Sequence, residues 1–272
     1  MTYQLIDSGE EMKLEQFGQY KLIRPCPQAL WKKSHLQLWQ EADAEFSREK
    51  SERWSFARKI PKEWPLAFGG IQCKISPTEF GHLGVFPEHA ALWEELRPLV
   101  RKGNPNILNL FAYSGCATIA LAQEGARVCH LDASKGMVDW ARENCALNRL
   151  EKAPIRWIVD DAIKFLKREV RRETRYDGIL LDPPTFGRGS QGEVFKIERD
   201  IIPLLDLCRS VLSKEPMFVY FSCHTPGMTP TGIRHLAYQM FRGAKIETGE
   251  MLLESPGALP IPSGVFAKVR YA

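Results

Sequence analysis

Patterns typical of strands and of helices alternate along residues 106–224. Short apolar runs of about five residues are typical of strands buried on both faces of a parallel sheet. Such runs occupy residues 107–111, 128–132, 155–159, 178–182 and 217–222. Helical patterns lie between them, at residues 116–124, 135–148, 162–171 and 198–212. This alternation predicts an α/β fold with a Rossmann-like sheet that carries helices on both faces.

The last fifty residues predict an antiparallel end to this sheet. A further helix is expected around residues 232–241, and strands are expected at 245–252 and 265–271. A loop rich in Pro and Gly, residues 255–264, joins these strands without an intervening helix. Two consecutive strands connected in this way indicate an antiparallel terminal hairpin at the sheet edge.

The first hundred residues have a different pattern, with short extended pieces between polar and Pro-rich breaks. Residues 19–24 predict a strand, and residues 66–75 predict a hairpin around Gly69-Gly70. Residues 32–58 are rich in charge and predict a loosely helical or irregular connection. Residues 88–100 have helical spacing and lead into the larger domain.

Two domains are therefore expected: a small N-terminal, mostly-β region at residues 1–101 and a larger domain at residues 102–272.

Composition narrows the class of protein. No apolar run approaches the ~18 residues that span a bilayer, and the N-terminus lacks a basic and apolar leader pattern. The expectation is a cytoplasmic protein without a membrane partner. Seven cysteines without a CxxC pair argue against a disulfide framework and against a zinc site, so no metal is expected. A net charge of +4 permits nucleic-acid binding without requiring it.

The most informative run begins with the apolar residues 179–181 and continues as Asp182-Pro183-Pro184-Thr185-Phe186. Pro183 removes a backbone donor and disfavours a helical conformation at Asp182, so the strand ends there. The turn then displays a carboxylate and an aromatic ring at the carboxyl edge of the sheet. Open α/β sheets bind their ligands at that edge.

Three further features predict a cofactor site at the same edge. Gly115 follows the first strand and precedes a helix, where the backbone can approach a ligand closely; a tight connection would read the same way. Asp132 ends the second strand and can bind the hydroxyls of a ribose, although it or Ser134 could equally be a helix N-cap. Asp161 follows the third strand and can accept from an adenine amino group. Together the acidic strand ends suit a cofactor with an adenosine at one end and an amino acid at the other.

On these residues the chain resembles the class I S-adenosylmethionine-dependent methyltransferases, and more narrowly the bacterial 23S rRNA (cytosine-5)-methyltransferase family. The matching segments are residues 108–115, 131–134, 141–148, 160–162, 182–186 and 221–223. Residues 84–89 also resemble the family's loop over the cofactor, but Glu88, His89 and Ala90 depart from its usual Asp-Gln-Arg.

The resemblance implies S-adenosylmethionine as the cofactor and a set of residues that bind it. They are Phe111, Tyr113 and Gly115 on the methionine side, Asp132 at the ribose, Asp161 at the adenine amino group, and Asp182 near the transferable methyl. Ala133 is a further cofactor-binding candidate.

Cys223 is the candidate nucleophile because it ends the fifth strand, next to the strand of Asp182. Cytosine C5 needs a thiolate to add at C6 before it attacks a methyl group, and a base then removes the C5 proton. The alternative for Cys223 is a buried cysteine that ends a strand. Related domains with the same Asp-Pro-Pro-Thr-Phe motif methylate a guanine ring nitrogen and need no cysteine. Asp182 is the second catalytic candidate in either case.

The substrate-binding candidates are Pro183, Pro184, Phe186 and Arg188. The Phe186 ring can stack on a flat base, and Arg188 belongs to a flexible basic loop at residues 187–192 that can contact phosphates. The expected partner is RNA, in particular ribosomal RNA, and the oligomeric state stays open. The leading hypothesis is methylation of cytosine C5 through Cys223. The alternatives are methylation of a guanine or adenine nitrogen, and a catalytically silent RNA-binding factor.

Overall fold

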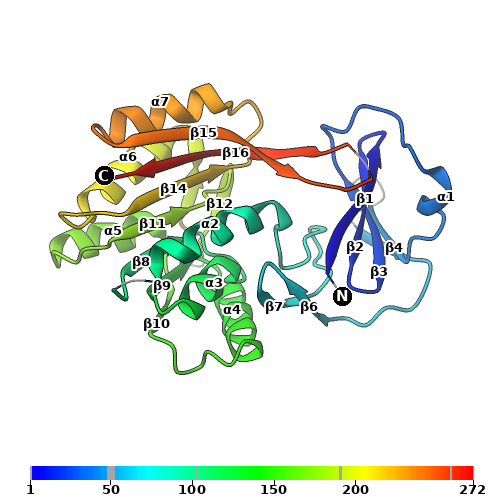
Figure 1. The fold of residues 1–272 in the computed structure, drawn as a ribbon, viewed down its shortest axis with the longest axis horizontal. Helices are drawn as coiled ribbons and strands as arrows, with labels where there is room; N and C mark the ends of the chain where they lie inside the picture. Colours follow the sequence, from blue (N-terminus) through cyan, green and yellow to red (C-terminus); the bar gives the residue numbers. More distant parts are fainter. Residues whose placement is uncertain (1, 48–52, 102, 190–191, 258, 272) are drawn as a thin grey trace. The chain divides into compact units, whose positions relative to one another are not determined.

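The computed structural model describes residues 2–47, 53–101, 103–189, 192–257 and 259–271 (Figure 1). The chain forms two compact units. Unit 1 comprises Met1–Ala91 and Leu252–Ser263, and unit 2 comprises Leu92–Met251 and Gly264–Ala272. The chain therefore returns to unit 1 between the last two strands of unit 2.

Unit 2 contains a seven-stranded sheet in the order β10-β9-β8-β11-β14-β16-β15. The strands are β8 (Asn106–Leu110), β9 (Arg127–Asp132), β10 (Ile155–Val159), β11 (Gly178–Leu181), β14 (Phe218–Cys223), β15 (Lys245–Leu253) and β16 (Ile261–Arg270). Strands β10, β9, β8, β11 and β14 pair in parallel, and β16 pairs antiparallel with β14. The Rossmann-like sheet and its antiparallel terminal hairpin are confirmed.

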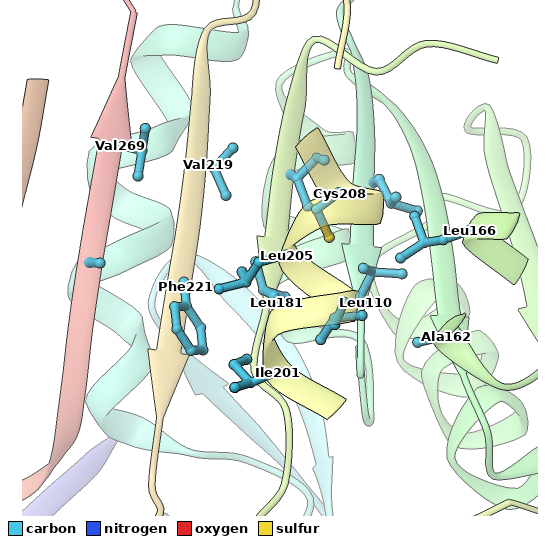
Figure 2. Close-up of a cluster of buried hydrophobic side chains, with 14 of the residues drawn as sticks. Leu110, Ala162, Leu166, Leu181, Ile201, Leu205, Cys208, Val219, Phe221 and Val269 are labelled. Carbon is cyan, nitrogen blue, oxygen red and sulfur yellow. The ribbon is translucent and has the colours of Figure 1, made fainter. Parts of the chain in front are cut away.

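Helices cover both faces of this sheet (Figure 1). They are α2 (Ala90–Val100), α3 (Cys116–Gln123), α4 (Lys135–Leu147), α5 (Ala162–Arg171), α6 (Ile197–Ser210) and α7 (Pro230–Met240). One buried cluster joins α5, α6 and α7 to the sheet, and Figure 2 shows Leu205 and Cys208 of α6 against Leu181 and Phe221. A second cluster joins α2 and α3 to the opposite face, through Leu180 among others.

Strand residues alternate between the two clusters, as the two-residue period of a strand requires. Along β14, Val219, Phe221 and Cys223 belong to the α5–α7 cluster, whereas Phe218 and Tyr220 belong to the α2–α3 cluster. This alternation decides which side chains of β14 lie on which face of the sheet.

Unit 1 is mostly β, as expected. Its main sheet has the order β1-β2-β3-β4-β5, and β6 and β7 form a separate pair. The elements are β1 (Tyr3–Gly9), β2 (Met12–Phe17), β3 (Tyr20–Pro25), α1 (Leu36–Trp39), β4 (Ala44–Ser47), β5 (Arg53–Phe56), β6 (Trp64–Phe68), β7 (Ile71–Ile75) and the 3-10 turn η1 (Pro87–His89).

Two sequence-based predictions of local structure were wrong. Residues 32–58 contain α1, β4 and β5 rather than a loose connection, because Ala44 and Phe46 bury their side chains in the sheet; residues 48–52 lie outside the described residues. The expected basic loop 187–192 was placed too early, because Gly187 and Arg188 belong to β12 (Phe186–Arg188), which pairs antiparallel with β13 (Val194–Lys196). Ser190 and Gln191 of that loop lie outside the described residues. Among the described helices, none is long and apolar enough to cross a bilayer.

Candidate active site

The predicted site residues lie at the carboxyl ends of the parallel strands, at one edge of the unit 2 sheet. Asp132 is the last residue of β9, Asp160 and Asp161 follow β10, Asp182 follows β11, and Cys223 is the last residue of β14. Because these strands are parallel and in register, the residues lie on the same edge. The ligand-binding edge of an open α/β sheet is therefore acidic in this chain.

The loop between β8 and α3 has an unusual backbone. Phe111, Tyr113 and Gly115 have φ values of 55°, 51° and 83°, so every second residue is left-handed. Such a conformation is uncommon for residues other than glycine, and alternation of this kind turns successive N–H groups toward one side. The Tyr113 N–H donates to Asp132 Oδ2 at 2.9 Å. The N–H groups of Ala112 and Gly115 donate to the carbonyls of Leu131 and Ala112, so the loop is fixed by its own hydrogen bonds, and its contact with a cofactor stays a prediction.

Asp132 is half-buried and accepts hydrogen bonds on both oxygens. In addition to Tyr113, the backbone N–H of Ser134 donates to Asp132 Oδ1 at 2.9 Å. Burial raises the pKa of Asp132, although both backbone hydrogen bonds lower it. Ala133 lies between Asp132 and the N-cap Ser134 of α4, whose hydroxyl accepts from Met137 N–H. The capping role therefore falls to Ser134, and the two oxygens of Asp132 join the loop at Tyr113 to the start of α4.

A buried polar network lies under this loop, and sequence reasoning missed it. Asn109 Nδ2 donates to Thr118 Oγ1 at 2.9 Å, and Thr118 Oγ1 lies 2.9 Å from His130 Nδ1. Asn144 Nδ2 donates to the carbonyl of Ser114 at 2.9 Å. Burial lowers the pKa of His130 to about 3, so the ring is neutral at physiological pH. The signal for this network was present, since Asn109 and His130 interrupt otherwise apolar strands.

Asp160 and Asp161, which follow β10, interact mainly with residues of α5 and its N-terminus. Asp161 is the N-cap of α5 and accepts from Lys164 N–H at 2.8 Å. Asp160 accepts from Asp161 N–H at 2.8 Å and pairs with Arg168. The expected contact of Asp161 with an adenine amino group stays a prediction.

Asp182 is held at the start of the Pro-Pro turn by a neighbouring strand. Ser222 Oγ donates to Asp182 Oδ1 at 2.8 Å, and His224 Nε2 lies 3.6 Å from the same oxygen. Thr185 Oγ1 and Thr225 Oγ1 are 2.9 Å apart and tie the loops that follow β11 and β14. The sequence did not predict that Ser222, His224 and Thr225 contact the Asp182-Pro183-Pro184-Thr185-Phe186 turn.

The residues that are expected to bind the substrate follow Asp182 in the chain. Pro183 is buried and Pro184 is exposed. Phe186 is 49% exposed, and the Arg188 guanidinium carbon lies 5.7 Å from the centre of its ring. Phe195 of β13 contacts Phe111 of the cofactor loop with 5.3 Å between ring centres. The β12–β13 hairpin thus presents an exposed aromatic–cation pair beside the loop.

Cys223 is more deeply buried than Asp182, although the Asp182 carboxylate is close enough to interact with its thiol. The residue is 1% exposed and belongs to the buried α5–α7 cluster, on the face of β14 opposite to Ser222. Burial and the carboxylate of Asp182 raise the pKa of the Cys223 thiol, although hydrogen bonds with Thr225 lower it. A thiol with a raised pKa is a poor source of thiolate.

Similarity to known proteins identifies the family. The sequence profile of the S-adenosylmethionine-dependent methyltransferases matches residues 98–212. A crystal structure of the SAM-dependent methyltransferase from Agrobacterium tumefaciens is 37% identical, with a TM-score of 0.96, and the match covers 99% of this chain and 90% of that one. The chain belongs to the S-adenosylmethionine-dependent methyltransferases.

A curated protein and a further solved structure are also similar to this methyltransferase. The ribosomal RNA large subunit methyltransferase K/L of Pseudomonas paraeruginosa is 30% identical over 205 residues, which is 75% of this chain and 27% of that protein. The chain spans about a quarter of the length of that curated relative. SMU.776, solved as a complex with SAH, is 19% identical with a TM-score of 0.80 over 99% of this chain and 75% of that chain, which shows a common fold.

The residues at the edge of this methyltransferase fit its cofactor, S-adenosylmethionine. That molecule offers hydroxyls, amino groups and a positive sulfonium, which all favour carboxylate partners. Asp132 and Asp182 supply such groups at the ends of β9 and β11, and the loop that contains Tyr113 and Gly115 follows β8, which lies between these two strands. The cofactor supplies the methyl group, and the chain supplies its orientation.

Proposed function

We propose that this enzyme methylates a nucleobase of large-subunit ribosomal RNA. The observation that carries the proposal is the Asp182-Pro183-Pro184 turn, whose carboxylate is fixed by Ser222 beside the exposed ring of Phe186. A carboxylate accepts from the N–H groups on the edge of a base, and an aromatic ring stacks on its face. The similarity to a ribosomal RNA large subunit methyltransferase supports RNA as the substrate.

The geometry favours a nitrogen of guanine or adenine over C5 of cytosine. Methylation at C5 requires the Cys223 sulfur to add to the ring as a thiolate, but this thiol is buried in the α5–α7 cluster and its pKa is raised. A nitrogen attacks the methyl carbon with its own lone pair. Asp182 orients the base, and where the attacking nitrogen carries a hydrogen, as an amino nitrogen does, the proton that it loses passes to Asp182 or to solvent, which is a step within general-base chemistry.

The deciding experiment supplies labelled S-adenosylmethionine and large-subunit rRNA, followed by hydrolysis and nucleoside analysis. We expect label in a methylated guanosine or adenosine. C223A should keep kcat within a few-fold of the wild type, as should C208A, which removes another buried thiol from the same cluster. D182A should lower kcat by about 10²- to 10⁴-fold.

Two outcomes would contradict the proposal at different levels. Label in 5-methylcytidine, together with loss of turnover in C223A alone, would restore the covalent mechanism through Cys223. No label in any nucleoside would exclude rRNA as the substrate.

A further inference from the structure

Unit 1 carries an aromatic and basic surface that the proposed methyl transfer does not use. We define the β5 surface as Arg53, Trp54 and Phe56 of β5, Arg58 and Lys59 that follow it, and Phe80 of the turn at Thr78–Gly81. We infer that the β5 surface binds a single-stranded segment of RNA. The inference rests on the proposed RNA substrate and assigns part of its recognition to unit 1.

The aromatic half of the surface is built on one face of β5. Trp54 and Phe56 are two residues apart on the strand, so their rings lie on the same face; the ring centres are 6.4 Å apart with an interplanar angle of 24°. Phe46 of β4 lies directly opposite Trp54 on the neighbouring strand, with 5.4 Å between the ring centres, and Trp54 Nε1 donates to the carbonyl of Thr78 at 2.8 Å. Trp54 is therefore fixed in place, whereas the Phe56 ring beside it is 53% exposed.

Phe80 extends the exposed aromatic area. It stands on the Thr78–Gly81 turn, which is closed by a 3.0 Å hydrogen bond from Gly81 N–H to the Thr78 carbonyl. A Cβ at Gly81 would lie 2.5 Å from the Phe46 ring, so the turn rests directly on the aromatic face. Phe80 is 71% exposed on this turn. Exposed rings on a rigid base have the form of a stacking platform for unpaired bases.

The positive charge of β5 and of the residues that follow it indicates which kind of partner binds. Residues 53–62 contain Arg53, Arg58, Lys59 and Lys62 and no Asp or Glu. The Arg58 side chain is 67% exposed and lies 3.6 Å from Asp43, while Arg53 and Lys59 form no ion pair with any described residue. Stacking rings beside cations fit a nucleic acid strand, since they contact bases and phosphates together. An apolar protein partner would not require these charges.

The test measures binding separately from methylation. Fluorescence anisotropy with a labelled single-stranded RNA oligonucleotide of mixed sequence reports the dissociation constant of the full chain. We expect F56A and F80A each to weaken binding by about five- to hundredfold, and F56W to retain it. R53A/K59A should reduce the slope of log K against log[salt] by about 1.4, the loss of two phosphate contacts on a single strand.

Matched variants in unit 2 control for general loss of surface. Y238A removes a 68% exposed ring from α7, and K152A/K245A removes two exposed cations; neither should change RNA binding. All variants of the β5 surface replace exposed side chains, so circular dichroism and the unfolding midpoint should match the wild type.

The outcomes separate this inference from the proposed function. Unchanged RNA affinity in F56A, F80A and R53A/K59A would overturn the role of the β5 surface even if the enzyme methylates rRNA. Concentration-dependent dimerisation that is lost in F56A, without any effect on RNA, would make this face a contact between copies and also overturn it. RNA binding that depends on these residues would uphold it even if no nucleoside becomes labelled.

Discussion

Gly115 is the most constrained position of the cofactor loop, and its replacement by alanine tests the description of that loop. Gly115 has a φ of 83°, which costs an alanine about 1–2 kcal/mol. An added Cβ would also lie 2.8 Å from the Cβ of Ala141 on α4 and 3.4 Å from His130 Cε1. Carbon atoms do not approach to 2.8 Å, so α4 or the loop has to move, at about 1–3 kcal/mol.

The sum predicts that G115A lowers the free energy of unfolding by about 2–5 kcal/mol. Gly243 offers a matched control, because it has a φ of 85° and no described heavy atom within 4 Å of its ideal Cβ position. G243A should therefore lose only the conformational part, about 1–2 kcal/mol. Denaturant unfolding of both variants measures the difference, which reports the crowding against Ala141.

Cofactor binding gives the second measurement. If the loop moves by enough to relieve about 1.4 kcal/mol of strain, binding of S-adenosylmethionine weakens about tenfold. Calorimetry should show this loss in G115A and not in G243A. A141G in the G115A background should recover part of the affinity, since it removes the nearest atom. Equal stability and equal affinity in G115A and G243A would refute the reasoning.

Three further predictions concern charged and titratable groups. D132N should weaken S-adenosylmethionine binding by about 10- to 100-fold, whereas calorimetry of D139N on the exposed face of α4 should show no change. The pKa of His130 is about 3 in the fold against 6.5 for a free side chain, so the free energy of unfolding falls as the pH drops below 6.5. Between pH 7 and 5, H130F should lose about 2 kcal/mol less of this free energy than the wild type. Parallel pH profiles of the two proteins would contradict this. Burial would raise the pKa of Glu15, but Arg24 and a lysine hold it at about 2, so E15Q should cost unit 1 about 3–5 kcal/mol in urea unfolding at pH 7, and a loss below 1 kcal/mol would argue against a buried pair.

The parallel strands of the unit 2 sheet could be predicted from the sequence because they are buried on both faces. All four residues of β11, Gly178–Leu181, are buried, so the strand is a continuous apolar run with nothing to confuse its period. The predicted elements of this unit match the observed ones to within a few residues, apart from the start of β16, which begins at Ile261 rather than at residue 265. Each segment there carries its own signal.

Unit 1 was harder to read because its interior contains charge. Asp7 on β1 is buried and accepts from the backbone of Ser34 and His35 and from Trp39 Nε1 at 2.8 Å. Glu15 on β2 is fully buried and pairs with Arg24 at 2.7 Å. Their partners lie up to 32 residues away in the chain, so from the sequence alone these buried positions resemble exposed ones. Neither β1 nor β2 could be predicted from periodicity.

At the candidate site the sequence predicted where β14 ends but not which face of the sheet each side chain of β14 lies on. The end of β14 places both Ser222 and Cys223 at the carboxyl edge, and chemistry alone makes the cysteine the more attractive residue. Adjacent residues of a strand point to opposite faces, however, so only one of the two can share a face with Asp182. Val219 and Phe221 belong to the α5–α7 cluster, which fixes Cys223 on that face, and Ser222 donates to Asp182 at 2.8 Å. A shift of one residue in the register of β14 against β11 would reverse the two roles, which is why the phase of this strand weighs more in the choice of methyl acceptor than the presence of a cysteine.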